Sequence, residues 1–230
     1  MSSSISRRRF LQATGVAASV GVAANADTGA AAPFKILGIA CSPRKGKTTS
    51  AAMTIALEAA RAVDPKRLEV ELLELADLDI PAYVAAAVPL KPGHKDDFPT
   101  VAAKLTDPRV AGFIIGTPVH CGSLSSLCKA FLDRCLALKK PNSVLANRVG
   151  GALAVGGARS GGQELAIQCI HAALFRHEVL IVGDGRPTCH TGASLWNTKD
   201  DISHDEIGKG TAVNLGRRVA EVVLARTPSK

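Results

Sequence analysis

Residues able to bind an anion gather directly after the first hydrophobic run of the chain. Segment 41–50 reads Cys-Ser-Pro-Arg-Lys-Gly-Lys-Thr-Thr-Ser, and a helical pattern follows it. Its hydroxyls, its basic side chains and the free backbone N–H groups of the predicted helix start converge at one place. An arginine binds phosphate oxygens as a fork, and the free N–H groups of a helix N-terminus attract the same anion. The segment is therefore predicted to hold a phosphate.

Two other interpretations of this segment stay open. Its Gly-Lys-Thr run is typical of a nucleotide-binding P-loop, but that pattern needs a glycine five positions earlier, where Cys41 stands. The candidate magnesium ligand, Asp184, follows the fifth hydrophobic run rather than a nearer one. Nucleotide hydrolysis is therefore disfavoured. The plainer interpretation is that the hydroxyls only cap the helix.

Two more loops carry residues suited to a planar ligand. Segment 117–125 reads Thr-Pro-Val-His-Cys-Gly-Ser-Leu-Ser, and its Pro and Gly indicate a turn. Segment 156–164 holds four glycines within seven residues, which lets a ligand approach the backbone closely, and Arg159 adds a cation. His120 is the candidate proton donor to a reduced cofactor or substrate. The alternative is that its side chain points to solvent while its backbone contacts the ligand.

Hydrophobic runs that alternate with helical patterns must position these loops. The expected strands cover 34–40, 68–75, 112–116, 149–155 and 179–182, and the expected helices 48–63, 123–138, 162–175 and 207–225. This alternation predicts an α/β fold with a parallel sheet covered on both faces. The second run alternates apolar residues with Glu, so it belongs at a sheet edge and gives the order 2-1-3-4-5. Ligands of such sheets bind at the carboxyl ends of the strands.

Taken in order, the three loops resemble those of the NAD(P)H-dependent FMN reductase superfamily, most nearly its iron–sulfur flavoprotein branch. The resemblance spans Phe34 to Ala225 and implies a flavodoxin-like three-layer sandwich that binds FMN. It implies that the FMN phosphate contacts Ser42, Arg44, Lys47, Thr48 and Thr49. It implies that the isoalloxazine edge contacts Pro118, Val119, His120, Cys121, Gly122 and Ser123. The pyrimidine side would lie against Gly157, Ala158, Arg159 and Gly162.

The chain departs from that family pattern in two places. The iron–sulfur branch has clustered cysteines after the second strand, whereas the segment from Asp79 to Phe98 contains none, so no cluster is implied. His120 and Cys121 stand where aromatic residues usually follow Pro-Val, and this affects the expected redox tuning and substrate stacking.

The six cysteines do not have the spacing of a metal site, because no pair is separated by two residues. Cys128 and Cys135 lie on the apolar stripe of a predicted helix and are expected in the core. An oxidising compartment would allow a disulfide between Cys41 and Cys121, which follow neighbouring strands.

The first 26 residues have the layout of an export signal. Three arginines precede Phe10 and Leu11, a weakly apolar stretch follows, and Ala24-Asn25-Ala26 offers a cleavage site. The layout resembles a twin-arginine signal, so we expect a periplasmic protein exported in its folded state. The expected organisation is a signal (1–26), a linker (27–33) and one FMN-binding domain (34–226). The alternative for the signal is a disordered basic tail.

Composition excludes several classes of partner. The apolar stretch of the signal is too short for a membrane-spanning helix of ~20 residues. The chain carries a net charge of +8, and loss of the three arginines with no acidic residue leaves 25 basic and 20 acidic side chains, or +5. Aromatic residues are 3% of the chain, which argues against a stacking platform for nucleic acid.

The expected function is that of an FMN-dependent oxidoreductase that passes electrons from NAD(P)H or another donor to a quinone, flavin or oxidised metal. Since NAD(P)H is not expected to be free in the periplasm, a redox protein or quinol is an alternative donor. A second hypothesis is an exported flavodoxin-like electron carrier without its own substrate, and a third is a non-redox binding protein. The resemblance also implies a homodimer or homotetramer, with Pro81–Phe98, including Tyr83, as the candidate contact.

Overall fold

A computed structural model provides the structure of the protein and describes residues 33–226. The chain divides into two units, Met1–Ala31 and Ala32–Lys230, and all the described residues belong to the second. The predicted signal and nearly all of the predicted linker lie outside the described residues. Within residues 33–226, no helix is both long and apolar enough to cross a membrane.

A parallel sheet with the strand order β2-β1-β3-β5-β6 forms the centre of the domain. Its long strands are β1 (Phe34–Ala40), β2 (Leu68–Glu74), β3 (Val110–His120) and β5 (Val149–Gly156). The edge strand β2 is mostly half-buried, as its alternation of apolar residues with Glu predicts. The predicted flavodoxin-like order 2-1-3-4-5 is confirmed, because the short strand β4 (Ser123–Leu124) only shifts the numbering.

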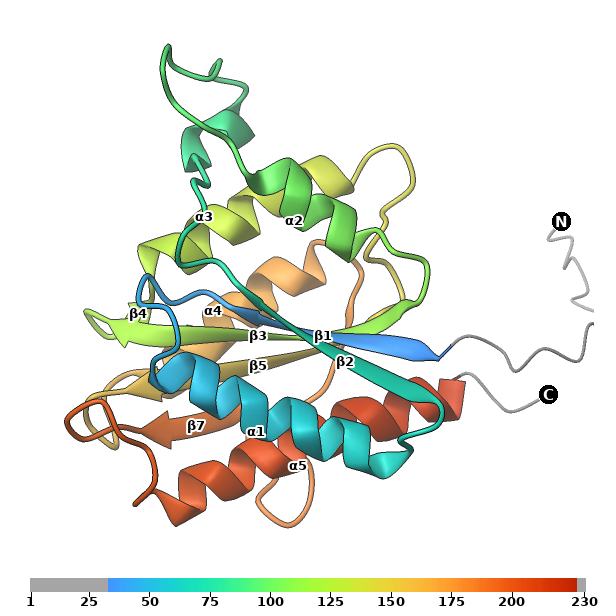
Figure 1. The fold of residues 1–230 in the computed structure, drawn as a ribbon, viewed down its shortest axis with the longest axis vertical. Coiled ribbons are helices and arrows are strands. Elements are labelled where there is room, and N and C mark those ends of the chain that lie inside the picture. The colour runs from blue at the N-terminus through green and yellow to red at the C-terminus, as the bar shows by residue number, and fades with distance from the viewer. Residues whose placement is uncertain (1–32, 227–230) are drawn as a thin grey trace, which may run out of the picture. The chain divides into compact units, whose positions relative to one another are not determined.

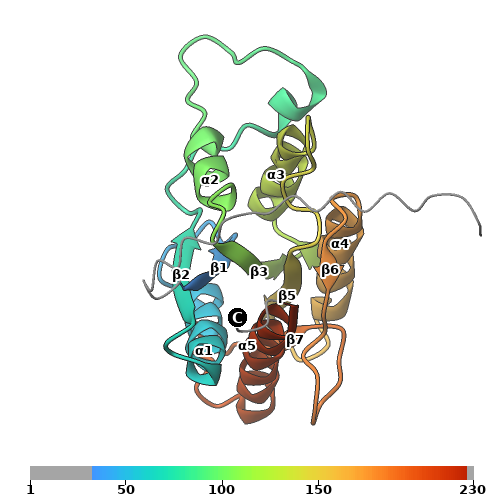
Figure 2. The same cartoon turned by 90° about the vertical axis from the view of Figure 1, so that its right-hand side faces the viewer.

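Helices cover both faces of the sheet (Figures 1 and 2). One layer holds α1 (Thr48–Val63) and α5 (Glu206–Arg226), and the other holds α2 (Phe98–Leu105), α3 (Ser126–Arg134) and α4 (Gln163–Phe175). Each layer encloses its own apolar core. A Cβ at Gly216 would lie 1.8 Å from the Ala56 carbonyl oxygen, so glycine there lets α5 approach α1 closely.

The fifth strand differs from the prediction. Instead of one strand over 179–182, β6 (Leu180–Ile181) pairs with the start of β5 and β7 (Ala193–Trp196) pairs with its end. Residues 183–192 leave the sheet between these two short strands. Pro187 in that segment has no N–H for a sheet ladder, and Gly185 adopts a φ of 71°. The interruption creates a loop that lies beside α5.

Two helical predictions also need correction. The expected helix over 123–138 begins only at Ser126, because Ser125 is its N-cap and accepts a hydrogen bond from the Cys128 N–H. It continues as the 3-10 helix η3 (Cys135–Leu138). The helix α2 was not predicted, although Phe98, Val101 and Leu105 are buried on one side of it.

A hairpin replaces the simple turn expected after the third strand. The strand β3 reaches His120, four residues beyond the predicted end, and β4 returns antiparallel to it. Cys121 and Gly122 connect them with φ values of 49° and 77°. Positive φ at both central residues is the geometry of a type I′ turn, whose twist suits a two-residue hairpin.

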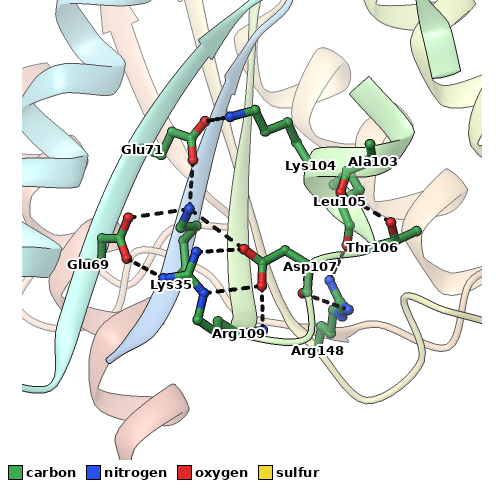
Figure 3. A network of polar contacts seen from close by, with 10 residues as sticks. All are labelled: Lys35, Glu69, Glu71, Ala103, Lys104, Leu105, Thr106, Asp107, Arg109 and Arg148. Carbon is green, nitrogen blue, oxygen red and sulfur yellow. Dashed lines mark hydrogen bonds and ion pairs between the residues drawn. The ribbon is translucent and has the colours of Figure 1, made fainter. Parts of the chain in front are cut away.

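Charged side chains form a dense network at the amino end of the sheet (Figure 3). The buried Lys35 ammonium lies 2.9 Å from Glu71, 3.3 Å from Glu69 and 3.8 Å from Asp107. Arg109 bridges Asp107 and Glu69 at 2.9 and 3.0 Å. The hydrogen bond that Lys35 donates to Glu71 raises the pKa of Lys35, so this buried ammonium stays charged.

Candidate functional site

The three predicted ligand loops meet at the carboxyl end of the sheet, on the left in Figure 1. They are the β1–α1 loop, the β3–β4 hairpin and the β5–α4 loop. Because β1, β3 and β5 are adjacent and parallel, their carboxyl ends open onto one edge. The fold thus brings together the predicted site residues from three distant parts of the chain.

The N-terminus of α1 offers hydrogen-bond donors that have no partner within the described part of the chain. The N-cap residue Lys47 makes no side-chain cap. The N–H groups of Thr48 and Thr49 likewise donate to no described group, and both residues are buried. Free N–H groups at a helix start attract an anion. This geometry disfavours the interpretation of the hydroxyls as helix caps only.

Glu74, at the end of β2, fixes the first half of the same loop. Its carboxylate accepts hydrogen bonds from the Gly46 N–H at 2.8 Å and from the Ser50 hydroxyl. Ser42 adds a local turn, because its Oγ accepts from the Arg44 N–H at 3.1 Å. These contacts hold the loop open around the helix start without occupying the donors of Thr48 and Thr49.

A distant carboxylate meets the two cations of the loop. The Arg44 guanidinium binds Asp200 through two atom pairs, at 2.9 and 2.8 Å, and the Lys47 ammonium lies 3.8 Å from the same carboxylate. Lys199 and Asp200 have φ values of 52° and 63° in a tight turn, which presents the carboxylate to the loop. The Arg44 hydrogen bond lowers the pKa of Asp200. Arg44 and Lys47 thus already face an anionic group.

The other two loops contact each other at glycines. A Cβ on Gly162, whose φ is 110°, would lie 2.7 Å from the Cα of Gly122. At Gly157, by contrast, a Cβ would meet nothing within 4 Å. The backbone is therefore tightly packed at one end of the β5–α4 loop and open at Gly157, where a flat group can approach it.

Gln163 shapes the β5–α4 loop and was missed by the sequence analysis. Its buried side-chain amide donates to the carbonyls of Ala158 and Leu195 at 2.6 and 3.1 Å. Its oxygen accepts from the Gly161 N–H at 2.8 Å. A buried amide with three hydrogen bonds holds the loop in one conformation.

The single tryptophan of the chain, also missed, borders this loop. The Trp196 indole N–H donates to the Gly157 carbonyl at 3.3 Å. The Arg159 guanidinium carbon lies 5.3 Å from the centre of the indole ring, and the His204 ring meets it edge-on at 4.9 Å. A lone aromatic at the end of a late apolar run was the available sequence signal.

His120 ends β3, on the exposed hairpin. Only its backbone pairs, with Ser123, and its side chain has no hydrogen bond among residues 33–226. It can therefore face either solvent or a bound ligand, and its role as proton donor stays a prediction. The assignment of the other named residues to FMN is likewise a prediction that the geometry allows.

The disulfide between Cys41 and Cys121 is not formed. Both are free thiols, with Cys41 buried and Cys121 exposed on the hairpin turn. The hairpin carries Cys121 beyond the end of β3, whereas the Cys41 side chain packs in the core. Burial raises the pKa of Cys41, which keeps it a thiol. Cys128 and Cys135 are buried, as predicted.

Between β2 and α2 an arm of the chain projects from the domain (Figures 1 and 2). It contains the 3-10 helix η2 (Ala82–Ala86), none of whose residues is buried. A largely buried ion pair ties its far end to α3, with Arg134 and Asp96 joined at 2.8 Å. Val88 and Leu90 on the arm are 45% and 42% exposed.

Comparison with known proteins finds a family whose sequence profile matches most of the chain. The sequence profile of the NADPH-dependent FMN reductase family matches residues 34–193. The chain is 37% identical over 195 residues to the iron–sulfur flavoprotein MJ1083 of Methanocaldococcus jannaschii, covering 83% of this chain and 97% of that one. It is 32% identical over 194 residues to the iron–sulfur flavoprotein of Methanosarcina thermophila, covering 83% and 95%.

Solved structures share the fold. The apo form of the NADH:FMN oxidoreductase EMOB superposes with a TM-score of 0.59 at 21% identity, covering 84% of this chain and 91% of that one. A flavodoxin, WrbA-like protein from Agrobacterium tumefaciens gives a TM-score of 0.57 at 18% identity, covering 83% and 97%. At these identities the likeness establishes the flavodoxin-like fold alone.

Proposed function

Because the chain belongs to the NADPH-dependent FMN reductase family, we propose that it passes electrons from NAD(P)H or another donor to a small acceptor. The acceptor class is a quinone, a flavin or an oxidised metal. Its family makes the chain an FMN-dependent oxidoreductase. Bound FMN supplies the hydride and electron transfer, while the chain binds and orients the cofactor.

The observation that carries the proposal is the helix start of α1. The N–H groups of Thr48 and Thr49, which have no partner in the described part of the chain, and the cations Arg44 and Lys47 beside them match the needs of a phosphate monoester. The Asp200 carboxylate would lie beside the phosphate and share Arg44 with it. Family membership and this donor set agree on FMN.

The two glycine-bearing loops would hold the flavin ring. The hairpin offers backbone groups from Pro118 to Ser123, and the open backbone at Gly157 suits the flat pyrimidine side. Arg159, which lies beside the Trp196 ring and 3.5 Å from the Asp205 carboxylate, would supply a cation there. A nearby cation favours the reduced, anionic form of the cofactor and so raises its potential. His120 on the hairpin would donate a proton at the ring edge or to substrate.

Which molecule donates the electrons depends on the compartment in which the protein works. If the first 26 residues export the folded protein to the periplasm, a redox protein or quinol would replace NAD(P)H. An exported electron carrier without its own substrate is the second candidate, favoured by the same N-terminal arginines.

The arm supports a homodimer or homotetramer. It exposes apolar side chains yet forms no core of its own, and an apolar pocket of about 500 Å³ lies between η2 and η3. A second copy would cover these side chains and close the flavin edge. Light scattering on wild type and Leu136→Glu tests this, because Leu136 lines the pocket and is 54% exposed. A monomeric wild type contradicts it.

Purified protein separates the functional candidates. We expect a flavin absorption spectrum, release of FMN on denaturation, and oxidation of NADPH, NADH or a quinol when a quinone or ferric acceptor is supplied. Bound FMN without turnover from any donor favours the electron carrier. A colourless protein that fails to bind added FMN contradicts both and favours a non-redox binding protein.

A further inference from the structure

A second concave site lies away from the predicted flavin loops, between the 183–192 loop and the middle of α5. Its pocket has a volume of about 550 Å³. Asn214 is the lining residue of α5 nearest to the start of that helix, and it lies eight residues beyond that start, about 12 Å along the helix axis. Figure 1 shows the orange loop beside α5, remote from the carboxyl end where the flavin loops lie.

A buried carboxylate gives the loop a defined conformation. Asp184 has no solvent exposure and accepts hydrogen bonds from the Thr188 hydroxyl and the His190 N–H. The His190 ring lies 3.3 Å from the same carboxylate. Thr188 also accepts from the Asn214 amide at 2.9 Å, which joins the loop to α5. Hydrogen bonds therefore hold the loop that forms this wall of the pocket in a defined conformation.

Three guanidinium groups converge on this pocket. Arg217 reaches from α5 to donate to the Arg186 carbonyl. Arg218 reaches the same loop, because its side-chain carbons lie 3.4 Å from where a Cβ of Gly185 would be. Arg186 lines the pocket from the loop, and its side chain has no hydrogen bond or ion pair within residues 33–226.

Neither of the two carboxylates that line the pocket makes a hydrogen bond to these guanidinium groups. Glu221 is 3.7 Å from both Arg217 and Arg218, longer than a hydrogen bond, and is itself 45% exposed. Asp184 is already occupied within its loop. Clustered guanidinium groups with free planar donors are suited to an oxyanion that several of them can bind at once.

From these contacts we propose that the pocket binds a small multivalent oxyanion of the phosphate or polycarboxylate type. Arg186 and Arg218 would bind it directly, and Arg217 would orient the Arg186 backbone. The pocket is separate from the phosphate loop of the proposed flavin site and does not depend on FMN. Cys189 lines the same pocket as an exposed thiol and offers an independent reporter.

Calorimetric titration with inorganic pyrophosphate tests the proposal, with citrate as the carboxylate arm. An Arg44→Gln background weakens the phosphate loop as a competing anion site. We expect one saturable site, weakened at least ~10-fold by Arg186→Gln or Arg218→Gln. The control Arg176→Gln, an exposed arginine at the end of α4, should leave the affinity unchanged.

Thiol labelling gives a second readout that a folding defect would not mimic. Pyrophosphate should slow alkylation of Cys189 and leave the exposed Cys121 unaffected. The proposal is overturned by absence of binding in the Arg44→Gln background, by equal weakening in the Arg176→Gln control, or by equal protection of both thiols. The last two outcomes would mean only diffuse attraction to a basic surface.

Discussion

The charged and polar groups at the two ends of the parallel sheet differ in how completely they are paired with one another. At the amino end, Lys35 is buried among three carboxylates, and each charged group has partners (Figure 3). At the carboxyl end, Arg44 and Lys47 are 55% and 50% exposed and share the carboxylate of Asp200, while N–H groups at the start of α1 have no partner among residues 33–226. Groups that satisfy one another stabilise the fold, whereas groups left free are available for a ligand.

The largest expected effect is at the amino end. Lys35→Met leaves Glu69, Glu71 and Asp107 facing each other without their shared cation. Since all three carboxylates are partly exposed, we expect a loss of about 2 kcal/mol of unfolding free energy rather than the full penalty of a buried pair. Urea unfolding measures it, and FMN affinity should not change.

The matched control for that change is Lys45→Met at the carboxyl end. Lys45 pairs with Asp77 at 2.6 Å, but both side chains are more than 60% exposed. Its loss should leave the urea midpoint almost unchanged. Equal destabilisation by both variants would mean that the amino-end network has no special role.

The next effect is at the phosphate loop. Arg44→Gln removes a forked, charge-assisted contact to the expected phosphate, so the Kd for FMN should rise about 10-fold, with little change in unfolding. Fluorescence titration with FMN measures the Kd. Lys45→Gln in the same loop, which faces Asp77, should change it less than about twofold. An unchanged Kd in Arg44→Gln would remove this residue from the site.

At the amino end of the sheet, the His177 side chain differs from the paired groups around it, and its effect on stability depends on pH. The imidazole is buried, its Nδ1 has no partner in the described structure, and burial lowers its pKa, with Lys139 and Arg176 adding to the effect. Because the unfolded chain binds a proton more readily, stability is full above pH ~6.5 and falls below it, by at most about 1.4 kcal/mol per pH unit. In His177→Phe the slope between pH 6.5 and 5 should shrink, and an identical slope in both proteins contradicts this.

The smallest effect concerns the carboxylate that faces the phosphate loop. Asp200→Asn removes a negative charge beside the expected phosphate and frees Arg44 to bind it. FMN affinity should therefore rise a few-fold, by about 3-fold at low ionic strength, and the gain should shrink in salt. Asp201→Asn on the neighbouring position is the control. Weaker FMN binding in Asp200→Asn would mean that Asp200 instead orients Arg44 for the ligand.

The sequence predicted the fold well because the fold depends on local patterns. The apolar runs and the Glu alternation of β2 decide which strands lie inside and which lies at the edge. The split of the fifth strand could not be predicted, since β6 and β7 are short and only pairing with β5 defines them. The brief helix α2 was hidden by the prolines and polar residues around it.

The site likewise contains residues that local motifs indicate and residues that only the folded chain brings together. The phosphate loop and the two glycine-bearing loops are contiguous motifs, so the sequence indicated them directly. Asp200 reaches Arg44 from 156 positions away, and Trp196 reaches Gly157 from 39 positions away. No local spacing encodes such contacts. The pairing of Cys41 with Cys121, which the sequence left open, is not formed for a related reason, because a hairpin that local spacing does not encode separates the two thiols.

One titration tests the central claim, that the unsatisfied carboxyl end binds FMN. Trp196 is the only tryptophan of the chain and contacts the β5–α4 loop, so its emission reports on that edge of the sheet. Added to protein freed of cofactor, FMN should quench this emission to saturation at one FMN per chain, and riboflavin, which lacks the phosphate, should bind at least ~10-fold more weakly. Absence of saturable quenching, or equal affinity for FMN and riboflavin, would contradict the account.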